Sequence, residues 1–180
     1  EKAAGQFSEA SEACLTFSEL TQQIETRYEK LLAVSDQELD LAVFLKDQFQ
    51  PRFQSFSRNL PVADVARADM CLSPSDLGFH NALRCRDGRL VFVDFEYFGW
   101  DDPVKLVCDF LLHPAMDSST TEKGQFWEGA KELFAADPAF QERFYLFYPY
   151  YALRWCMILL NEFLPERWQR RQAAGELKTI

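Results

Sequence analysis

Three oxygen-bearing side chains stand at fixed points around a short stretch of expected β-structure. Asp76 precedes this stretch, Asn81 begins it and Asp94 lies near its end. A hairpin between them would bring all three groups to one rim. One carboxylate and one amide oxygen suit Mg²⁺, a hard cation that proteins bind through oxygen atoms together with substrate phosphates. The remaining carboxylate would accept a proton from, or orient, an incoming hydroxyl. This division of labour is that of phosphoryl transfer.

The hairpin is expected from two short strands joined by a turn dipeptide. Residues 82–86 form the first strand, and Asp87-Gly88 suits a two-residue turn because both residues tolerate positive φ. Residues 89–95 alternate between two faces, as a strand does. Asp94 then lies just inside the end of a strand, where an ionised carboxylate beside apolar neighbours is costly unless a cation meets it. The alternative is an ordinary hairpin whose Asp and Asn side chains form turns or caps.

This arrangement resembles the catalytic core of the aminoglycoside phosphotransferase and choline kinase families, which are small-molecule relatives of the protein kinases. The resemblance covers about residues 70–113 and rests on Asp76-x4-Asn81, the hairpin, and the Val-Asp-Phe-Glu of residues 93–96. It implies that Asp76 is the catalytic Asp and that Asn81 and Asp94 are magnesium ligands. It also implies ATP as co-substrate and a small-molecule hydroxyl as acceptor.

Two positions depart from the families' pattern. Pro74 stands where these families usually have a His, which puts the support of the loop in doubt. Gly78 stands where protein kinases have a Lys, which favours a small-molecule kinase over a protein kinase.

Residues 1–70 contain no glycine-rich phosphate loop and no Ala-x-Lys on an expected strand. We therefore expect a single unit, residues 1–180, equivalent to the C-terminal lobe of a protein-kinase-like fold, with its catalytic and metal loops in residues 69–103 and without the N-terminal nucleotide lobe. Such a chain would be an ATP-dependent small-molecule kinase if an N-terminal lobe completed it. The alternative is a non-catalytic, kinase-like binding or assembly module.

Other side chains near the motif have two interpretations each. His80 is a general base or makes a loop hydrogen bond. Asp109, which the resemblance places on the helix after the metal loop, is a structural carboxylate accepting backbone hydrogen bonds from that loop, or a surface Asp. Glu96 could support the metal site as an outer carboxylate. Three arginines around the turn would either contact phosphates or be solvated: Arg84, Arg86 and Arg89. Three acids would contact a cationic acceptor: Asp117, Glu128 and Glu162.

The rest of the chain predicts a mainly α fold with a small β-hairpin, an α+β class. Apolar periodicity predicts a helix over residues 1–34, and Ser35 with Glu38 forms a capping-box pattern for the next helix. Pro51 should kink or restart that helix. Asp102 as N-cap with Pro103 at the first helical position predicts the helix that follows the metal loop. Further predictions are a strand at residues 70–72 and helices at 121–136, from 138 to 163, and from Arg167 to about 176.

Composition limits the possible partners. A net charge of −9 argues against nucleic acid and suits a cationic acceptor, although ordinary solubility explains it as well. Five Cys without a CxxC pair indicate reduced thiols in a cytoplasmic protein. The longest apolar run, residues 145–163, contains Pro149 and Arg154 and is expected to be a buried helix, so no membrane span is predicted. An apolar face where the other lobe would pack makes a homo-oligomer one expected state.

Overall fold

The computed structural model describes residues 6–56 and 64–167. In this part the chain is mainly helical, with two small antiparallel sheets, which confirms the α+β class. The helices are α1 (Phe17–Val34), α2 (Leu39–Val43), α3 (Gln50–Phe56), α4 (Pro103–Leu112), α5 (Thr120–Leu133) and α6 (Phe140–Leu159). The strands are β1 (Cys71–Ser73), β2 (Ala82–Arg84), β3 (Leu90–Phe92) and β4 (Gly99–Asp101). The helix predicted from Arg167 onward lies almost wholly outside the described residues.

The first helix begins later than its apolar pattern suggests. Thr16 caps α1 by accepting a hydrogen bond from the Glu19 backbone N–H at 3.1 Å, and the Glu19 carboxylate accepts one from the Thr16 N–H at 2.9 Å. This capping box stops the helix at its N-terminal end. Residues before it run extended along β4, with the Ala10 N–H donating to the Trp100 carbonyl at 2.9 Å. The prediction of a helix is therefore wrong for residues 6–16, and residues 1–5 lie outside the described part of the chain.

The helical segment that follows α1 differs from the prediction in how it begins, and it changes helix type near Pro51. The predicted capping box of Ser35 and Glu38 is wrong, because the Ser35 hydroxyl donates back to the Leu32 carbonyl at 2.8 Å within a short 3-10 turn. Next to Pro51, where a kink or restart is predicted, the helix type changes and α3 begins at Gln50. A π-helical turn, Phe44–Phe49, directly precedes α3, and the chain stays helical through Pro51 to the end of α3. Such wider turns accommodate a local break in the hydrogen-bond ladder.

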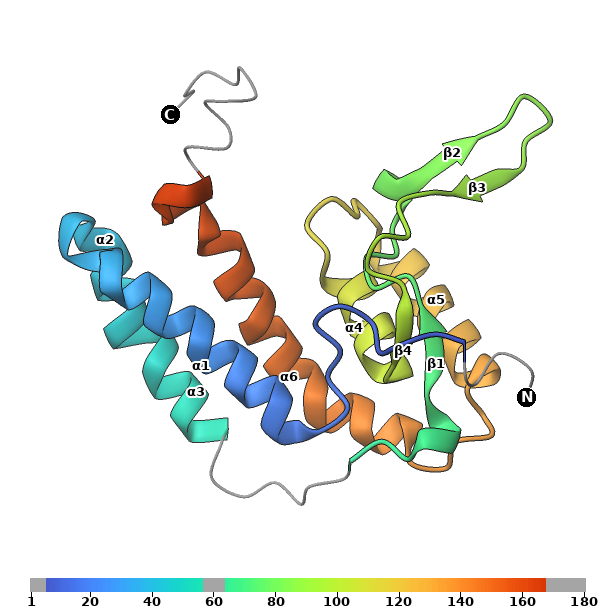
Figure 1. Cartoon of the computed structure of the whole chain (residues 1–180), viewed down its shortest axis with the longest axis horizontal. Helices are drawn as coiled ribbons and strands as arrows, with labels where there is room; N and C mark the ends of the chain where they lie inside the picture. Colours follow the sequence, from blue (N-terminus) through green and yellow to red (C-terminus); the bar gives the residue numbers. More distant parts are fainter. Residues whose placement is uncertain (1–5, 57–63, 168–180) are drawn as a thin grey trace.

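The two sheets differ in their sequence signals. The predicted hairpin is present as β2 and β3, which pair Ala82 with Phe92, and it projects away from the helices (Figure 1). Its loop has three residues rather than two, because the Cys85 N–H donates to the Arg89 carbonyl and only Gly88, at φ 87°, has positive φ. The other sheet pairs β1 with β4, a strand that the sequence does not predict because three residues show no alternation.

The core lies where α6 packs against α1 and α4 (Figure 1). Its fully buried side chains include Ile24 and Leu31 of α1, Val104 of α4 and Met157 of α6. Asp102 caps α4 as predicted, accepting from the Val104 N–H at 2.9 Å. This packing fixes the start of α4 directly beside β4, and so positions the loops at that end of the molecule.

The helices and thiols agree with two further expectations. Within the described ranges, no helix combines the length and apolar character that crossing a bilayer requires. All five Cys are free thiols, as predicted. Burial raises the pKa of Cys14 and of Cys71 to about 12 in each case, so neither is a reactive thiolate at neutral pH.

Candidate active site

The loop between β1 and β2 holds the predicted catalytic carboxylate. Asn81, at the end of the 3-10 turn Phe79–Asn81, donates its side-chain N–H to the backbone carbonyl of Asp76 at 3.0 Å and to its Oδ2 at 3.1 Å. The structure therefore brings these two predicted site residues into direct contact. The spacing of five residues suits this arrangement, because one tight turn lets the amide reach back to the carboxylate.

Asp94 reaches the same end of the hairpin through the backbone. The Val93 N–H donates to the Asn81 carbonyl at 2.9 Å, which extends the strand pairing by one step. Asp94 follows at φ 66° and is exposed, beyond the end of β3 rather than inside it, so its predicted position within a strand is wrong. Among the described residues its carboxylate makes no hydrogen bond or ion pair. It lies beside Asn81 along the backbone, without a side-chain contact to Asn81 or Asp76.

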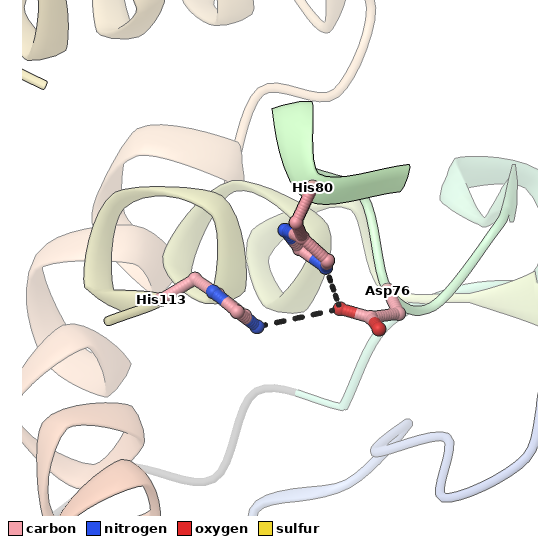
Figure 2. Close-up of side chains that lie close together, drawn as sticks. All are labelled: Asp76, His80 and His113. Carbon is pink, nitrogen blue, oxygen red and sulfur yellow. Dashed lines mark hydrogen bonds and ion pairs between the residues drawn. The ribbon is translucent and has the colours of Figure 1, made fainter. Parts of the chain in front are cut away.

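Two histidines, one from the 3-10 turn Phe79–Asn81 and one from the end of α4, lie close to Asp76. His80 Nε2 lies 3.1 Å and His113 Nε2 lies 3.6 Å from Asp76 Oδ1, and the imidazole rings stack with centroids 4.2 Å apart (Figure 2). One ligand-type atom from each of the three residues falls within 4.8 Å of the others. By geometry alone the cluster has the composition of a transition-metal site.

The hydrogen bond on the far side of His113 argues against a metal there. The Ala115 N–H donates to His113 Nδ1 at 3.1 Å, so Nδ1 carries a lone pair and the neutral ring carries its hydrogen on Nε2. Burial lowers the pKa of His113, and the nearby His80 lowers it further, against a smaller opposing effect of Asp76, which favours this neutral ring. His113 therefore points an N–H toward Asp76. The two rings orient the carboxylate rather than forming a metal centre.

A chain of buried charges lies beneath this loop. Lys105 of α4, which is fully buried, forms ion pairs with Asp101 at 3.0 Å and with Asp109 at 3.2 Å. Asp109 also accepts hydrogen bonds from Arg154 Nη1 at 3.2 Å and from Trp155 Nε1 at 2.8 Å. Asp109 is buried, so the surface alternative is wrong. Its partners are side chains, however, and not the backbone of the loop as predicted.

A pocket of about 390 Å³ opens beside Asp76. Its walls carry both signs of charge, with cations Arg27, Lys105, Arg154 and Arg167 and anions Glu12, Asp76 and Asp109. Ser75, next to Asp76, donates its hydroxyl to the Ser11 carbonyl at 3.2 Å, which ties the N-terminal segment to the wall of the pocket.

Backbone strain is concentrated around this site. In the described part of the chain, the non-glycine residues with positive φ are Glu12 at 59°, Ser75 at 66° and Asp94 at 66°. Glu12 and Ser75 line the pocket, and Asp94 is the predicted metal ligand. Such conformations cost on the order of 1 kcal/mol or more and gather at functional sites.

The remaining candidates lie away from the pocket. Glu96 is exposed in a turn and hydrogen-bonds Tyr97. Arg89 pairs with Asp87 on the exposed hairpin at 2.8 Å, which favours the solvated interpretation for this arginine. Glu128 pairs with Lys131. The other exposed candidates are Arg84, Arg86, Asp117 and Glu162, none of which lines this pocket.

Several site residues carry no local sequence signal. His113 stands at the end of α4, and Glu12 and Arg27 come from the first segment of the chain, far in sequence from Asp76. Arg154 gives one clue, because an arginine within an apolar helix requires acidic partners once it is buried.

No protein-family model matches the chain, and the searches of curated proteins and of solved structures found no match either.

Proposed function

We propose that this chain is the C-terminal lobe of a kinase-like phosphotransferase, which transfers the γ-phosphate of ATP to a hydroxyl of a small molecule. Asp76 is the general base, and Asn81 with Asp94 holds Mg²⁺. The proposal rests on one observation: Asn81 contacts Asp76 through its side chain and carries Asp94 beside it through the backbone bond to Val93.

The donor atoms fit these roles. Asn81 uses its amide N–H to hold Asp76, so its amide oxygen, the atom suited to a hard cation, is not the one engaged. The Asp94 carboxylate is exposed and has no hydrogen-bond or ion-pair partner among the described residues. When bound, Mg²⁺ supplies positive charge to the phosphates of ATP. Asp76, held at Oδ2 by Asn81 and at Oδ1 by His80, would accept the proton of the acceptor hydroxyl.

A turnover measurement tests the role of Asp76. The chain, together with any native sequence preceding Glu1, is assayed for ATP- and magnesium-dependent phosphorylation of a panel of small hydroxyl compounds. Asp76→Asn should lower kcat by about 10²- to 10⁴-fold with little change in KM for ATP, because it removes only the proton acceptor. Asp87→Asn, on the exposed hairpin turn, is the matched control and should leave turnover unchanged. Equal activity of the Asp76→Asn and Asp87→Asn variants would show that Asp76 is not the base.

A non-catalytic binding or assembly module is the second candidate. The hairpin favours it, because its apolar side chains face solvent, with exposed fractions of 59% for Leu83, 50% for Leu90 and 42% for Val91. Calorimetry with Mg-ATP separates the two candidates. Binding that is lost in Asp94→Asn and kept in Asp87→Asn supports the phosphotransferase. If the chain, together with any native sequence preceding Glu1, binds no nucleotide, the module is supported.

A further inference from the structure

The charged side chains beside the pocket form one continuous series from solvent to core. Arg27 contacts Glu12 at 2.6 Å, and Glu12 contacts Arg154 at 2.9 Å. Arg154 continues the series to Asp109 at 3.2 Å, and Lys105 completes it by pairing with Asp109 and with Asp101. The series has three acids and three bases, so its formal charge is zero.

Glu12 differs from the other members of this series. Its side chain is 52% exposed, whereas that of Arg154 is 5% and that of Arg27 is 19% exposed. The other members belong to α1, β4, α4 and α6, but Glu12 lies in a turn with φ 59°. Glu12 is thus the most exposed member of the series and the one member that lies outside the helices and strands.

Departure of Glu12 would leave an unbalanced positive charge on the pocket wall. Arg27 and Arg154 would then direct guanidinium groups at the space that the Glu12 carboxylate occupies, a geometry that binds carboxylates and phosphates. An incoming anion would restore the charge balance of the series, while Arg154 keeps its ion pair with Asp109. The Ser75 to Ser11 hydrogen bond places this position next to the loop that carries Asp76.

We propose that Arg27 and Arg154 form a subsite for an anionic group of the acceptor, a carboxylate or a phosphate, and that Glu12 occupies this subsite in the free protein. The acceptor assignment rests on the proposed function; the anion binding does not. The pocket thereby favours an acidic or zwitterionic hydroxyl compound over the cationic acceptor that the net charge of the whole chain suggests.

Calorimetric titration with malonate and, separately, with inorganic phosphate tests the subsite on the 180-residue chain. Glu12→Gln should bind at least one of these anions about tenfold more tightly than the unsubstituted chain, because the internal competitor is gone. The matched control is Asp87→Asn, which removes a carboxylate from Arg89 and changes the net charge equally, away from the pocket. It should bind as the unsubstituted chain does. The double variant Glu12→Gln with Arg27→Gln should lose the gain.

The outcomes separate the sources of the anion. Tighter malonate binding assigns a carboxylate, and tighter phosphate binding assigns a phosphate group. The subsite is overturned if the Glu12→Gln variant binds the anions no more tightly than the Asp87→Asn variant does. It is also overturned if the double variant keeps the tighter binding. If Mg-ATP competes with the anion, the assignment of the subsite to the acceptor is overturned. If the Glu12→Gln variant unfolds, malonate is titrated into the unsubstituted chain and the NMR chemical shifts of Arg27 and Arg154 are followed. Shift changes that saturate support the subsite, and the absence of such changes overturns it. The anion titration needs neither magnesium nor ATP. A failure of the subsite can therefore be distinguished from a failure of the proposed phosphoryl transfer.

Discussion

His113, which lies 3.6 Å from Asp76, has a lowered pKa, and this makes the stability of the fold depend on pH. Burial and the nearby His80 hold the pKa of His113 below its ordinary value of 6.5. A depressed histidine pKa means that the unfolded chain takes up a proton first as the pH falls. The contribution of the neutral His113 to the free energy of unfolding is therefore complete above pH 6.5. It is lost as the pH falls from 6.5 through the folded-state pKa.

NMR titration of the imidazole signals checks this coupling, and the chain contains only two His to assign. We expect His113 to titrate below 6.5. His80→Gln should raise the pKa of His113, because it removes the neighbouring imidazole whose charge opposes protonation of His113. A His113 that titrates at or above 6.5 would contradict the neutral donor that the Ala115 hydrogen bond indicates.

At the scale of residues, local contacts were predictable and distant ones were not. The contact between Asp76 and Asn81 follows from a spacing that one turn can close. The sequence also indicates the backbone path to Asp94, because the hairpin has a recognisable turn dipeptide. His113 and Glu12 reach the pocket through the packing of α4 and of the N-terminal segment, which no short pattern encodes.

Gly99 of β4 allows the N-terminal segment to lie against the sheet. A Cβ built at this position would come within 2.6 Å of backbone atoms of Ser8, Glu9 and Ala10. Backbone atoms cannot rotate away as a flexible side chain can. The segment therefore approaches β4 closely only because residue 99 has no side chain.

Gly99→Ala should destabilise the protein by about 2 kcal/mol, as overpacking generally does. It should also accelerate hydrogen exchange at the Ala10 amide, which donates to the Trp100 carbonyl. The control is Gly124→Ala in α5, where a Cβ meets nothing within 4 Å, and it should stabilise the helix by about 1 kcal/mol. Urea denaturation and exchange measured by NMR distinguish the two. Unchanged exchange at Ala10 in Gly99→Ala would mean that the clash is relieved elsewhere.

The ends of the elements depended on chemistry that competes with periodicity. Asp102 with Pro103 gave a correct start for α4, because the cap and the proline act locally. The apolar pattern before Phe17 looks helical, yet the capping box of Thr16 and Glu19 and the pairing with β4 end the helix there. The strand β4 depends on its partners in β1 and the N-terminal segment, and so it left no pattern of its own.

Across the whole molecule, Arg143 joins three parts of the chain. This buried arginine of α6 contacts Asp102 at the start of α4 at 3.0 Å and Asp137, between α5 and α6, at 2.7 Å. Arg143→Met should cost about 3–5 kcal/mol, because both carboxylates would stay buried without the cation that neutralises them. Urea denaturation measures this cost. Arg89→Met, which breaks an exposed pair, should cause no measurable change.

The pH dependence of the Arg143→Met variant gives a second readout. Burial raises the pKa of Asp102, and Arg143 opposes that rise. Without the arginine the folded-state pKa rises further above the unfolded value of 3.8. The deficit in stability should therefore shrink as the pH is lowered, since a protonated Asp102 is no longer a buried charge. A deficit that is independent of pH would point to lost packing as its cause.

The pocket is completed by residues that lie far apart in the sequence. The Cys14 N–H donates to Asp101 Oδ1 across 87 residues, and Arg154 reaches Glu12 across 142. Contacts between such distant residues form late, because they close long loops. On the ribosome the segment around Glu12 emerges before β4 and α6, so these contacts cannot form until both have been made. A nascent or truncated chain without α6 lacks the Arg154 wall of the pocket, even where the loop with Asp76 has already folded.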